Sequence, residues 1–119
     1  MALDLSRFEE LEWDPEDQED GNWQHCARPG RLGPRPERVV HEVLSEDPVE
    51  FRMSLQTAQF SIVGPDVSTS SLYVVLLDTS DRRGDFLRPV TGWPATRRAR
   101  EAWEKGCRAG GIVRTWLNL

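Results

Sequence analysis

The 119-residue sequence has few of the side chains that build metal sites and nucleophiles. It contains two cysteines, Cys26 and Cys107, which form no CxxC pair, and two histidines, His25 and His41. His25 and Cys26 offer too few ligands for zinc, and adjacent residues on a helix do not face each other as a nucleophile and its base must. We therefore expect no metal, no cofactor and no cysteine nucleophile, with two free thiols as in a reducing compartment.

Long apolar runs are missing as well. The longest, LYVVLL at Leu72–Leu77, is much shorter than a membrane span, and the acidic N-terminus MALDLSRFEELEWD is unlike a signal peptide. The sequence also has no phosphate-binding glycine loop, no HExxH pair and no EF-hand spacing. These absences predict a cytoplasmic protein that makes no membrane contact.

The N-terminal part of the chain has few basic residues and the C-terminal part has few acidic ones, although the net charge is only −5. Residues 1–50 contain 14 acids and 5 arginines, whereas residues 82–114 contain 9 Lys and Arg against 3 acids. A negative net charge argues against a general hold on duplex nucleic acid. The uneven distribution instead favours a local anion site on an acidic body, or docking to a charged partner.

The basic part of the chain is organised around Leu87–Lys105, LRPVTGWPATRRAREAWEK. It predicts a short strand, a turn and a cationic helix, in which Pro94 takes the first helical position and Gly106 ends the helix. The expected helix has one apolar stripe at i, i+4, i+7 and i+8, made of Ala95, Ala99, Ala102 and Trp103.

The cations of this segment have a structural and a functional interpretation. Pairs at i, i+4 along the helix would make an ordinary solvated face that contributes little to stability. They join Arg97 to Glu101, Arg100 to Glu104 and Glu101 to Lys105. Four arginines lack such a partner and are better candidates for contact with an anion: Arg82, Arg83, Arg88 and Arg98. Composition alone slightly favours the structural interpretation.

The remaining elements are expected from periodicity and from turn residues. An edge strand is expected over 7–13. A polar helix should follow, with Asp14 as its N-cap and Pro15 as its first residue. A Pro/Gly-rich loop is expected over 28–36 and a second helix over 36–47. Strands are expected over residues 49–56, 58–63, 72–77 and 85–91, with a loop over 79–84. Residues 112–119 fit either a helix or a strand.

These elements predict an α+β fold in one domain over residues 1–119. The expected architecture is an antiparallel sheet of four to five strands, with two N-terminal helices and one C-terminal basic helix. Leu72–Leu77 should be the central strand, buried on both faces. Pro89 cannot donate to a strand ladder, so its strand should be an edge strand or carry a bulge there.

Several segments, in this order, resemble one family. They are LEWDPEDQEDGN, VVHEVL followed by SEDPV, FSIVGP, LYVVLL and RPVTGWPATRRAREAWE, and they extend from Leu11 to Lys105. The chain resembles the BrnT-type toxins of bacterial toxin–antitoxin modules, most specifically at Trp13-Asp14-Pro15 and in the RPVT…ATRR block. The resemblance implies a RelE-like fold and an endoribonuclease that works without metal. It also implies neutralisation by a small DNA-binding antitoxin of ribbon-helix-helix type, with the complex repressing its own operon.

The family pattern is matched at some positions and lost at two others. The matching residues are Trp13, Asp14, Pro15, Asn22, Glu42, Asp47, Pro48, Gly64, Arg88, Thr91, Ala95 and Arg97. Pro29-Gly30 stands where the family commonly has a His-Gly pair, and Gly92-Trp93 stands where an Ala-Arg pair commonly follows the RPVT-like strand. Both missing side chains could serve a phosphate or a proton transfer, and His25 lies close enough in sequence to substitute.

RNA cleavage needs a base for the ribose 2′-OH, an acid for the leaving 5′-oxygen and cations for the charged phosphorane. Arg88 and Arg98 are the arginines expected to stabilise that charge, through paired N–H contacts to phosphate oxygens. Glu42 or His25 is the expected acid or base, although a solvated glutamate and a hydrogen-bonded histidine are the more ordinary interpretations. Further RNA and phosphate contacts are expected from Arg82, Arg83, Arg97 and Arg52.

A protein-binding or regulatory module with a weakened site is the competing interpretation. The overall acidity and the two missing family side chains favour it, and the acidic N-terminal half could dock a basic partner. An enzyme of the same fold that acts on another anion is a third possibility. The expected exposed edge strands also favour a homodimer or pairing with a partner strand.

Overall fold

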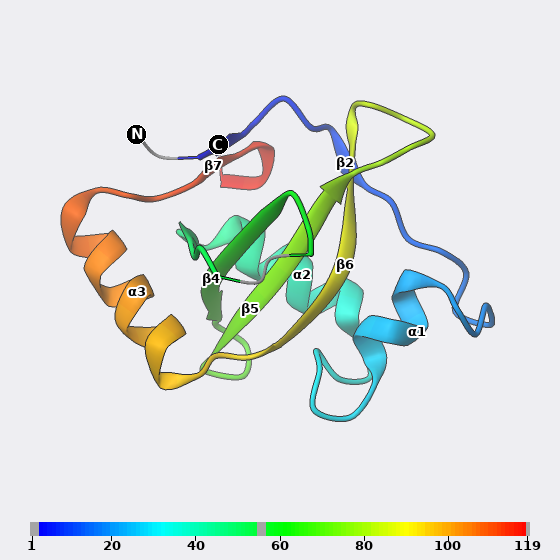
Figure 1. Cartoon of the computed structure of the whole chain (residues 1–119), viewed down its shortest axis with the longest axis horizontal. Helices are drawn as coiled ribbons and strands as arrows, with labels where there is room; N and C mark the ends of the chain where they lie inside the picture. Colours follow the sequence, from blue (N-terminus) through cyan, green and yellow to red (C-terminus); the bar gives the residue numbers. More distant parts are fainter. Residues whose placement is uncertain (1–2, 55–56, 119) are drawn as a thin grey trace.

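A five-stranded sheet forms the centre of the computed structural model, which describes residues 3–54 and 57–118 (Figure 1). In spatial order its strands are β2 (Glu10–Leu11), β6 (Phe86–Pro94), β5 (Ser71–Thr79), β4 (Phe60–Asp66) and β3 (Val49–Glu50). Neighbouring strands are antiparallel except β2 and β6, which run parallel. A separate parallel pair joins β1 (Asp4–Leu5) to β7 (Arg114–Thr115), so the two ends of the described chain lie side by side.

Helices cover both faces of the sheet. They are α1 (Asn22–Ala27), α2 (Pro36–Ser45), α3 (Arg97–Ala109) and a short 3₁₀ helix, η1 (Trp116–Asn118). The core on the α2 face contains buried residues of this helix and of three strands, namely Val39, Val40, Val43, Leu44, Ile62, Val75, Leu77 and Leu87. The smaller core on the α3 face contains Val49, Ala58, Val63, Val74, Leu76 and Ala99. These layers confirm the predicted α+β class in a single domain.

β5 is the central strand, as its unbroken apolar sequence predicts. Val75 and Leu77 belong to the core on the α2 face, whereas Val74 and Leu76 belong to the core on the α3 face. Alternate side chains of a strand point to opposite faces, so a strand that lies between two packed layers is apolar at every position.

The boundaries of α3 differ from those expected. Pro94 ends β6 instead of starting the helix, because the next backbone N–H, that of Ala95, donates to Leu72 and keeps the chain in the sheet. Thr96 is the N-cap, and its hydroxyl accepts the Ala99 N–H at 3.4 Å. Gly106 lies within α3, and the helix ends at Gly110, which adopts a left-handed conformation with φ of 74°.

Pro89 lies at a bulge, one of the two positions expected for it. Leu76 faces Thr91 and Leu77 faces Pro89 across the β5–β6 pair, which leaves Val90 as the extra residue. A bulge bends its strand and redirects the side chains around it. Arg88, Pro89 and Val90 all line the pocket described below.

The N-terminal segment differs most from the expectation. The strand expected over 7–13 is reduced to β2, and Asp14 caps no helix, because its carboxylate bonds Arg88 and the backbone of Asn22. The first helix therefore starts later, at Asn22, with Gly21 as its N-cap. The strand expected over 49–56 is reduced to β3, and residues 55–56 lie outside the described residues. The C-terminal residues form β7 and then η1, so both alternatives are used.

None of the helices in the described part of the chain is both long enough and apolar enough to cross a membrane.

Close packing of the β5–β6 pair requires a glycine at position 92. A Cβ added there would lie 2.6 Å from the Val74 carbonyl oxygen and 2.7 Å from the Leu32 side chain. We expect Gly92→Ala to lower the free energy of unfolding by about 1–3 kcal/mol, because a backbone oxygen cannot move aside. Gly111→Ala is the matched control, since its nearest contact would be an ordinary 3.5 Å. Denaturant unfolding measures both variants, and equal stabilities would contradict the packing argument.

Candidate functional site

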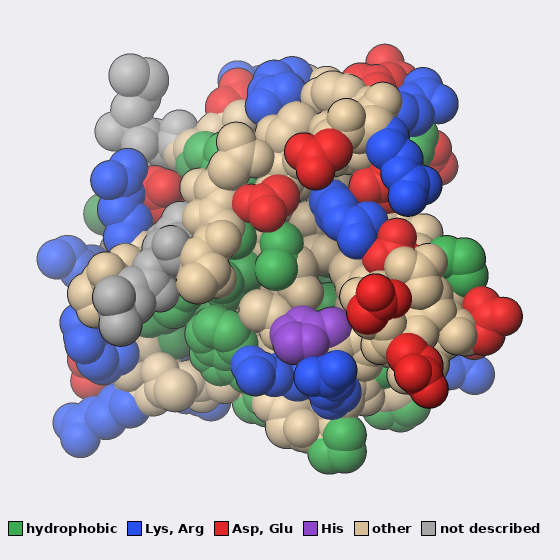
Figure 2. Space-filling model, turned by 45° about the vertical axis from the view of Figure 1, so that its right-hand side comes forward, with side chains coloured by type: hydrophobic (Ala, Val, Ile, Leu, Met, Phe, Trp, Pro, Cys, Tyr) green, Lys and Arg blue, Asp and Glu red, His purple; other side chains and the backbone are tan. Residues whose placement is uncertain are grey.

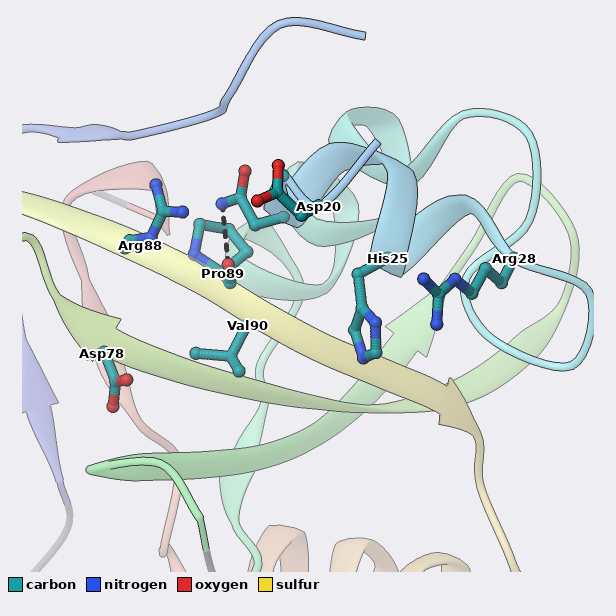
Figure 3. Close-up of a pocket in the computed structure, with 9 residues that line it drawn as sticks. Asp20, His25, Arg28, Asp78, Arg88, Pro89 and Val90 are labelled. Carbon is teal, nitrogen blue, oxygen red and sulfur yellow. Dashed lines mark hydrogen bonds between the residues drawn. The ribbon is translucent and has the colours of Figure 1, made fainter. Parts of the chain in front are cut away.

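An open pocket of about 310 Å³ lies between α1 and β6 (Figure 3). The residues that line it are Asp20, Gly21, Asn22, His25, Arg28, Asp78, Arg88, Pro89 and Val90. It brings together two of the site residues expected from the sequence, His25 and Arg88. Arg28, which the sequence analysis did not select, lies beside His25.

Asn22 holds α1 against the sheet and so forms one wall of the pocket. Its side-chain amide donates to the Pro89 carbonyl at 2.7 Å and to the Glu12 carbonyl at 3.0 Å. Its backbone N–H donates to Asp14 Oδ2 at 2.8 Å, and its Oδ1 accepts the Asp14 N–H at 2.8 Å. Four bonds from one buried residue fix the position of the first turn of α1. His25, one turn later, is thereby held over β6.

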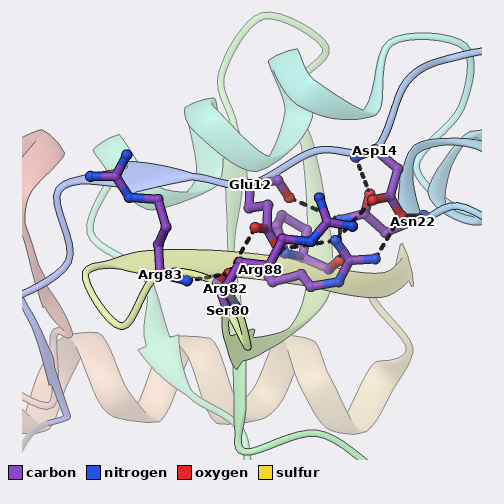
Figure 4. Close-up of polar contacts among 8 residues, drawn as sticks. Glu12, Asp14, Asn22, Ser80, Arg82, Arg83 and Arg88 are labelled. Atoms are coloured by element: carbon purple, nitrogen blue, oxygen red, sulfur yellow. Dashed lines mark hydrogen bonds and ion pairs between the residues drawn. The ribbon is translucent and has the colours of Figure 1, made fainter.

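Arg88 is engaged by two carboxylates in a cluster shown in Figure 4. Its Nη1 donates to Glu12 Oε1 and Asp14 Oδ1, both at 3.1 Å, and its Nη2 donates to Asp14 Oδ2 at 2.6 Å. The hydrogen bond from Arg88 lowers the pKa of Asp14, and the same bond raises the pKa of Arg88. In the sequence Arg88 has no partner at helical spacing, because Asp14 and Glu12 lie 74 and 76 positions away.

His25 is half-buried in a cationic environment. Burial, and then the charges of Arg28 and Arg31, lower the pKa of its imidazole below 6.5. The ring is therefore neutral at neutral pH, which is the form that accepts a proton. His25 and the side chains of Arg28 and Arg88 thus line one open pocket.

Arg98 and Arg52 lie in a different pocket, of about 250 Å³. It is lined by Phe51, Arg52, Met53, Ser54, Trp93, Thr96 and Arg98. Arg97 lies outside both pockets and pairs with Glu101 at 3.2 Å, which is one of the expected i, i+4 pairs. Glu42 lies on α2, where its carboxylate is 3.5 Å from the Ser68 hydroxyl, and it lines neither pocket.

Arg82 and Arg83 are on the loop between β5 and β6. The Ser80 hydroxyl accepts both of their backbone N–H groups, at 3.1 and 3.2 Å, and donates to Glu12 Oε2 at 2.7 Å. Arg83 also lies over the Phe86 ring, 4.3 Å from its centroid. The loop is thus tied to the Arg88 cluster, and Arg82 extends towards that cluster in Figure 4.

Two contributors to the site were missed from the sequence, Arg28 and Trp93. Arg28 follows His25 by three residues, a spacing that puts two side chains on one side of a helical turn, so a signal was present. In the sequence Trp93 stands out only as a departure from the BrnT-type pattern. Its pocket combines residues from three parts of the chain, which no local pattern reveals.

The cysteines and acidic side chains form no metal-type cluster in the described part of the chain. Cys26 and Cys107 are free thiols, and burial raises the pKa of Cys26 to about 12, which keeps it protonated. Within residues 3–54 and 57–118, no three His, Cys, Asp or Glu side chains come together as a metal site.

No protein-family model, curated protein sequence or solved structure matches the chain.

The Asp14–Arg88 contact makes stability depend on pH. Because the pKa of Asp14 is lowered in the folded state, its contribution is complete above its ordinary value of 3.8 and is lost as the pH falls below it. We expect Asp14→Asn to lower the free energy of unfolding at pH 7 by about 1–3 kcal/mol. The difference from the wild type should shrink as the pH approaches 2–3, on the order of one unit below the ordinary pKa.

Denaturant unfolding at a series of pH values measures this effect. Asp17→Asn is the matched control, because Asp17 is exposed in the same segment and has no hydrogen bond or ion pair among the described residues. A difference between Asp14→Asn and the wild type that stays constant from pH 7 to acid would refute the assignment.

Proposed function

We propose that the chain is a metal-independent endoribonuclease of the BrnT toxin type, with its reaction centre in the His25 pocket. The observation that carries the proposal is a half-buried imidazole beside Arg28 in an open pocket of about 310 Å³, where burial and the neighbouring arginines lower the pKa of the imidazole. The BrnT-type resemblance supports it independently, since the matching Asn22 and Arg88 line the same pocket.

The chemistry follows from one base and the cations around it. His25 takes the proton of a ribose 2′-OH, and the 2′-oxygen bonds to the adjacent phosphorus while the bond from phosphorus to the 5′-oxygen breaks. The leaving 5′-oxygen takes a proton from water, and His25 releases its proton to the solvent. The products are a 2′,3′-cyclic phosphate and a 5′-hydroxyl, and no metal or cofactor takes part.

Charge on the phosphorane is stabilised mainly by Arg28 in this proposal. Arg28 is exposed and pairs with no carboxylate among the described residues, so its N–H groups are available to phosphate oxygens. Arg88 has both terminal nitrogens bonded to Glu12 and Asp14, so it holds the pocket wall and is a weaker phosphate ligand than the sequence predicted. The proposal assigns no role to Glu42, because Glu42 lines neither pocket.

A protein-binding or regulatory module of the same fold is the second candidate. The observation in its favour is that Arg88 is engaged by two carboxylates. Residues 16–20 add four exposed acids beside α1, a surface suited to a basic partner such as a ribbon-helix-helix antitoxin. In that case the pocket would bind no RNA, and binding of the basic partner would depend on the four acids of residues 16–20.

Cleavage of single-stranded RNA in excess EDTA tests the first proposal. We expect the wild type to cleave, and His25→Ala and Arg28→Ala each to reduce the rate by about 100-fold or more, the scale for loss of a general base or a charge-stabilising donor. His41→Ala and Arg108→Ala are matched controls, because both side chains are exposed and line neither pocket. Failure of the folded wild type to cleave, or equal losses in the controls, would overturn the proposal.

The pH dependence of cleavage gives a separate test. A base whose pKa lies below 6.5 makes the rate rise with pH up to that pKa and stay level above it. Removing Arg28 removes one of the charges that lower the pKa, so the residual activity of Arg28→Lys should keep the wild-type profile and that of Arg28→Ala should shift to higher pH. A profile that continues to rise through pH 8 in the wild type would exclude His25 as the base.

A further inference from the structure

The pocket that contains Trp93 and Arg98 is not used by the reaction proposed above, although it is lined by two aromatic and two cationic side chains. Phe51 and Trp93 supply the rings, and Arg52 and Arg98 supply the charges. Its volume of about 250 Å³ is below the ~300–1,000 Å³ typical of sites for drug-sized ligands, and suits a single ring system. Rings beside arginines are the combination that proteins use to bind single-stranded nucleic acid.

Arg98 lies at the N-terminal end of α3, where a positive charge does not stabilise the helix. The first turn of α3 has no acidic residue and carries Arg97 and Arg98. The N-terminal end of a helix has partial positive charge, so cations there oppose helix formation. No carboxylate of the described residues pairs with Arg98, and Arg52 makes only a solvent-exposed contact with Glu50 at 3.6 Å. These arginines are therefore available to an anion.

The Trp93 pocket and the His25 pocket are joined by one loop. Arg28 lines the His25 pocket, and Arg31 lies over the Trp93 ring, 5.8 Å from its centroid. The Arg31 N–H donates to the Arg28 carbonyl at 3.0 Å, so a tight turn holds the two arginines together. Leu32 packs at Gly92, directly before Trp93, which fixes this turn against β6. Figure 2 shows Lys or Arg and hydrophobic side chains beside a histidine on one face of the molecule.

Strand β6 also connects the pockets. Val90 lines the first and Trp93 the second, and three residues of strand span about 10 Å. An extended RNA strand spans that separation with nucleotides two positions apart, so a dinucleotide is too short to reach both pockets. The cations Arg28 and Arg31 lie along the way, where the phosphates of such a strand would pass.

We propose that the Trp93 pocket is a nucleotide subsite beside the reaction centre: one base of a single-stranded RNA stacks on Trp93, and Arg98 and Arg52 contact the adjoining phosphates. The inference rests on the proposed function for the position of the scissile bond, but RNA binding by the subsite does not require cleavage. Stacking tolerates any base, so the subsite contributes affinity and sets a minimum substrate length.

Binding of a 2′-O-methyl oligonucleotide, which cannot be cleaved, tests the subsite by fluorescence anisotropy. We expect Trp93→Ala to weaken binding of a six-nucleotide probe by about tenfold or more, and Trp93→Phe to restore most of it, because a phenyl ring still stacks. Arg98→Ala should also weaken binding and reduce the salt dependence by about 0.7 in log–log slope, the value for one phosphate contact on a single strand. Arg108→Ala, on the last turn of the same helix, should change neither quantity.

A dinucleotide probe shows whether the subsite is separate from the reaction centre. The Trp93 substitutions should weaken binding of the dinucleotide much less than binding of the six-nucleotide probe, because the dinucleotide is too short to fill both pockets. If Trp93→Ala does not fold, Arg98→Glu tests the subsite in its place, since Arg98 is exposed and its substitution does not disturb the core. Equal affinities of the wild type, Trp93→Ala and Arg98→Glu for the long probe would overturn the inference.

The two proposals fail in different ways. If the wild type cleaves RNA and the Trp93 and Arg98 variants bind and cleave as it does, the subsite is excluded and the ribonuclease proposal stands. If the wild type binds the long probe through Trp93 and Arg98 without cleaving RNA, the subsite stands and the reaction is excluded. If the folded wild type binds no RNA, both are excluded.

Discussion

The guanidinium of Arg88 meets the carboxylates of Glu12 and Asp14 where the N-terminal segment leaves the sheet, and the pocket depends on this contact. β2 contributes only two residues to the sheet, so ladder bonds alone hold the segment weakly. The Asp14 side chain is only 7% exposed, and its Oδ2 accepts N–H groups from Arg88 at 2.6 Å and from Asn22 at 2.8 Å. Removing one partner from such a contact leaves a largely buried charge uncompensated. The path from Asp14 to Asn22, and with it the position of α1, is fixed in this way.

The same contact determines which cations can serve an anionic ligand. Arg88 is matched to two carboxylates, so the free positive charge beside the pocket comes from the Pro/Gly-rich loop, through Arg28 and Arg31. This loop is held at its middle, where Leu32 N–H donates to the Cys26 carbonyl at 2.9 Å and its side chain packs at Gly92. The loop is one of the two places where the sequence departs from the BrnT pattern, and Gly92-Trp93 is the other. In the structure the loop contacts Gly92-Trp93, through Arg31 over the Trp93 ring and Leu32 at Gly92.

Most of the fold could be predicted because it follows from periodicity. The alternation of strand residues and the apolar stripe of the second helix depend on local geometry, and the run Leu72–Leu77 of β5 is apolar because it is covered on both faces. The errors arose where a distant partner overrode a local preference. Asp14 is a good N-cap in sequence, but it is held by Arg88. Pro94 suits a helix start, but its neighbour Ala95 bonds to Leu72, and Gly106 allows close approach to Val49 within α3 instead of ending it.

The sequence by itself determined the α+β class, the cationic third helix and the choice of His25 and several arginines as candidates, because composition and spacing along the chain are enough for those conclusions. It could not decide which candidates meet. Arg88 and Asp14 are 74 positions apart, and Phe51 reaches Trp93 only through the packing of β3, β6 and α3. Only the tertiary structure pairs Arg88 with Glu12 and Asp14 and places Glu42 outside both pockets. It also puts Arg28 beside His25, without a carboxylate partner among the described residues. Charge pairing between distant residues depends on where the sheet brings them, and no local pattern contains that information.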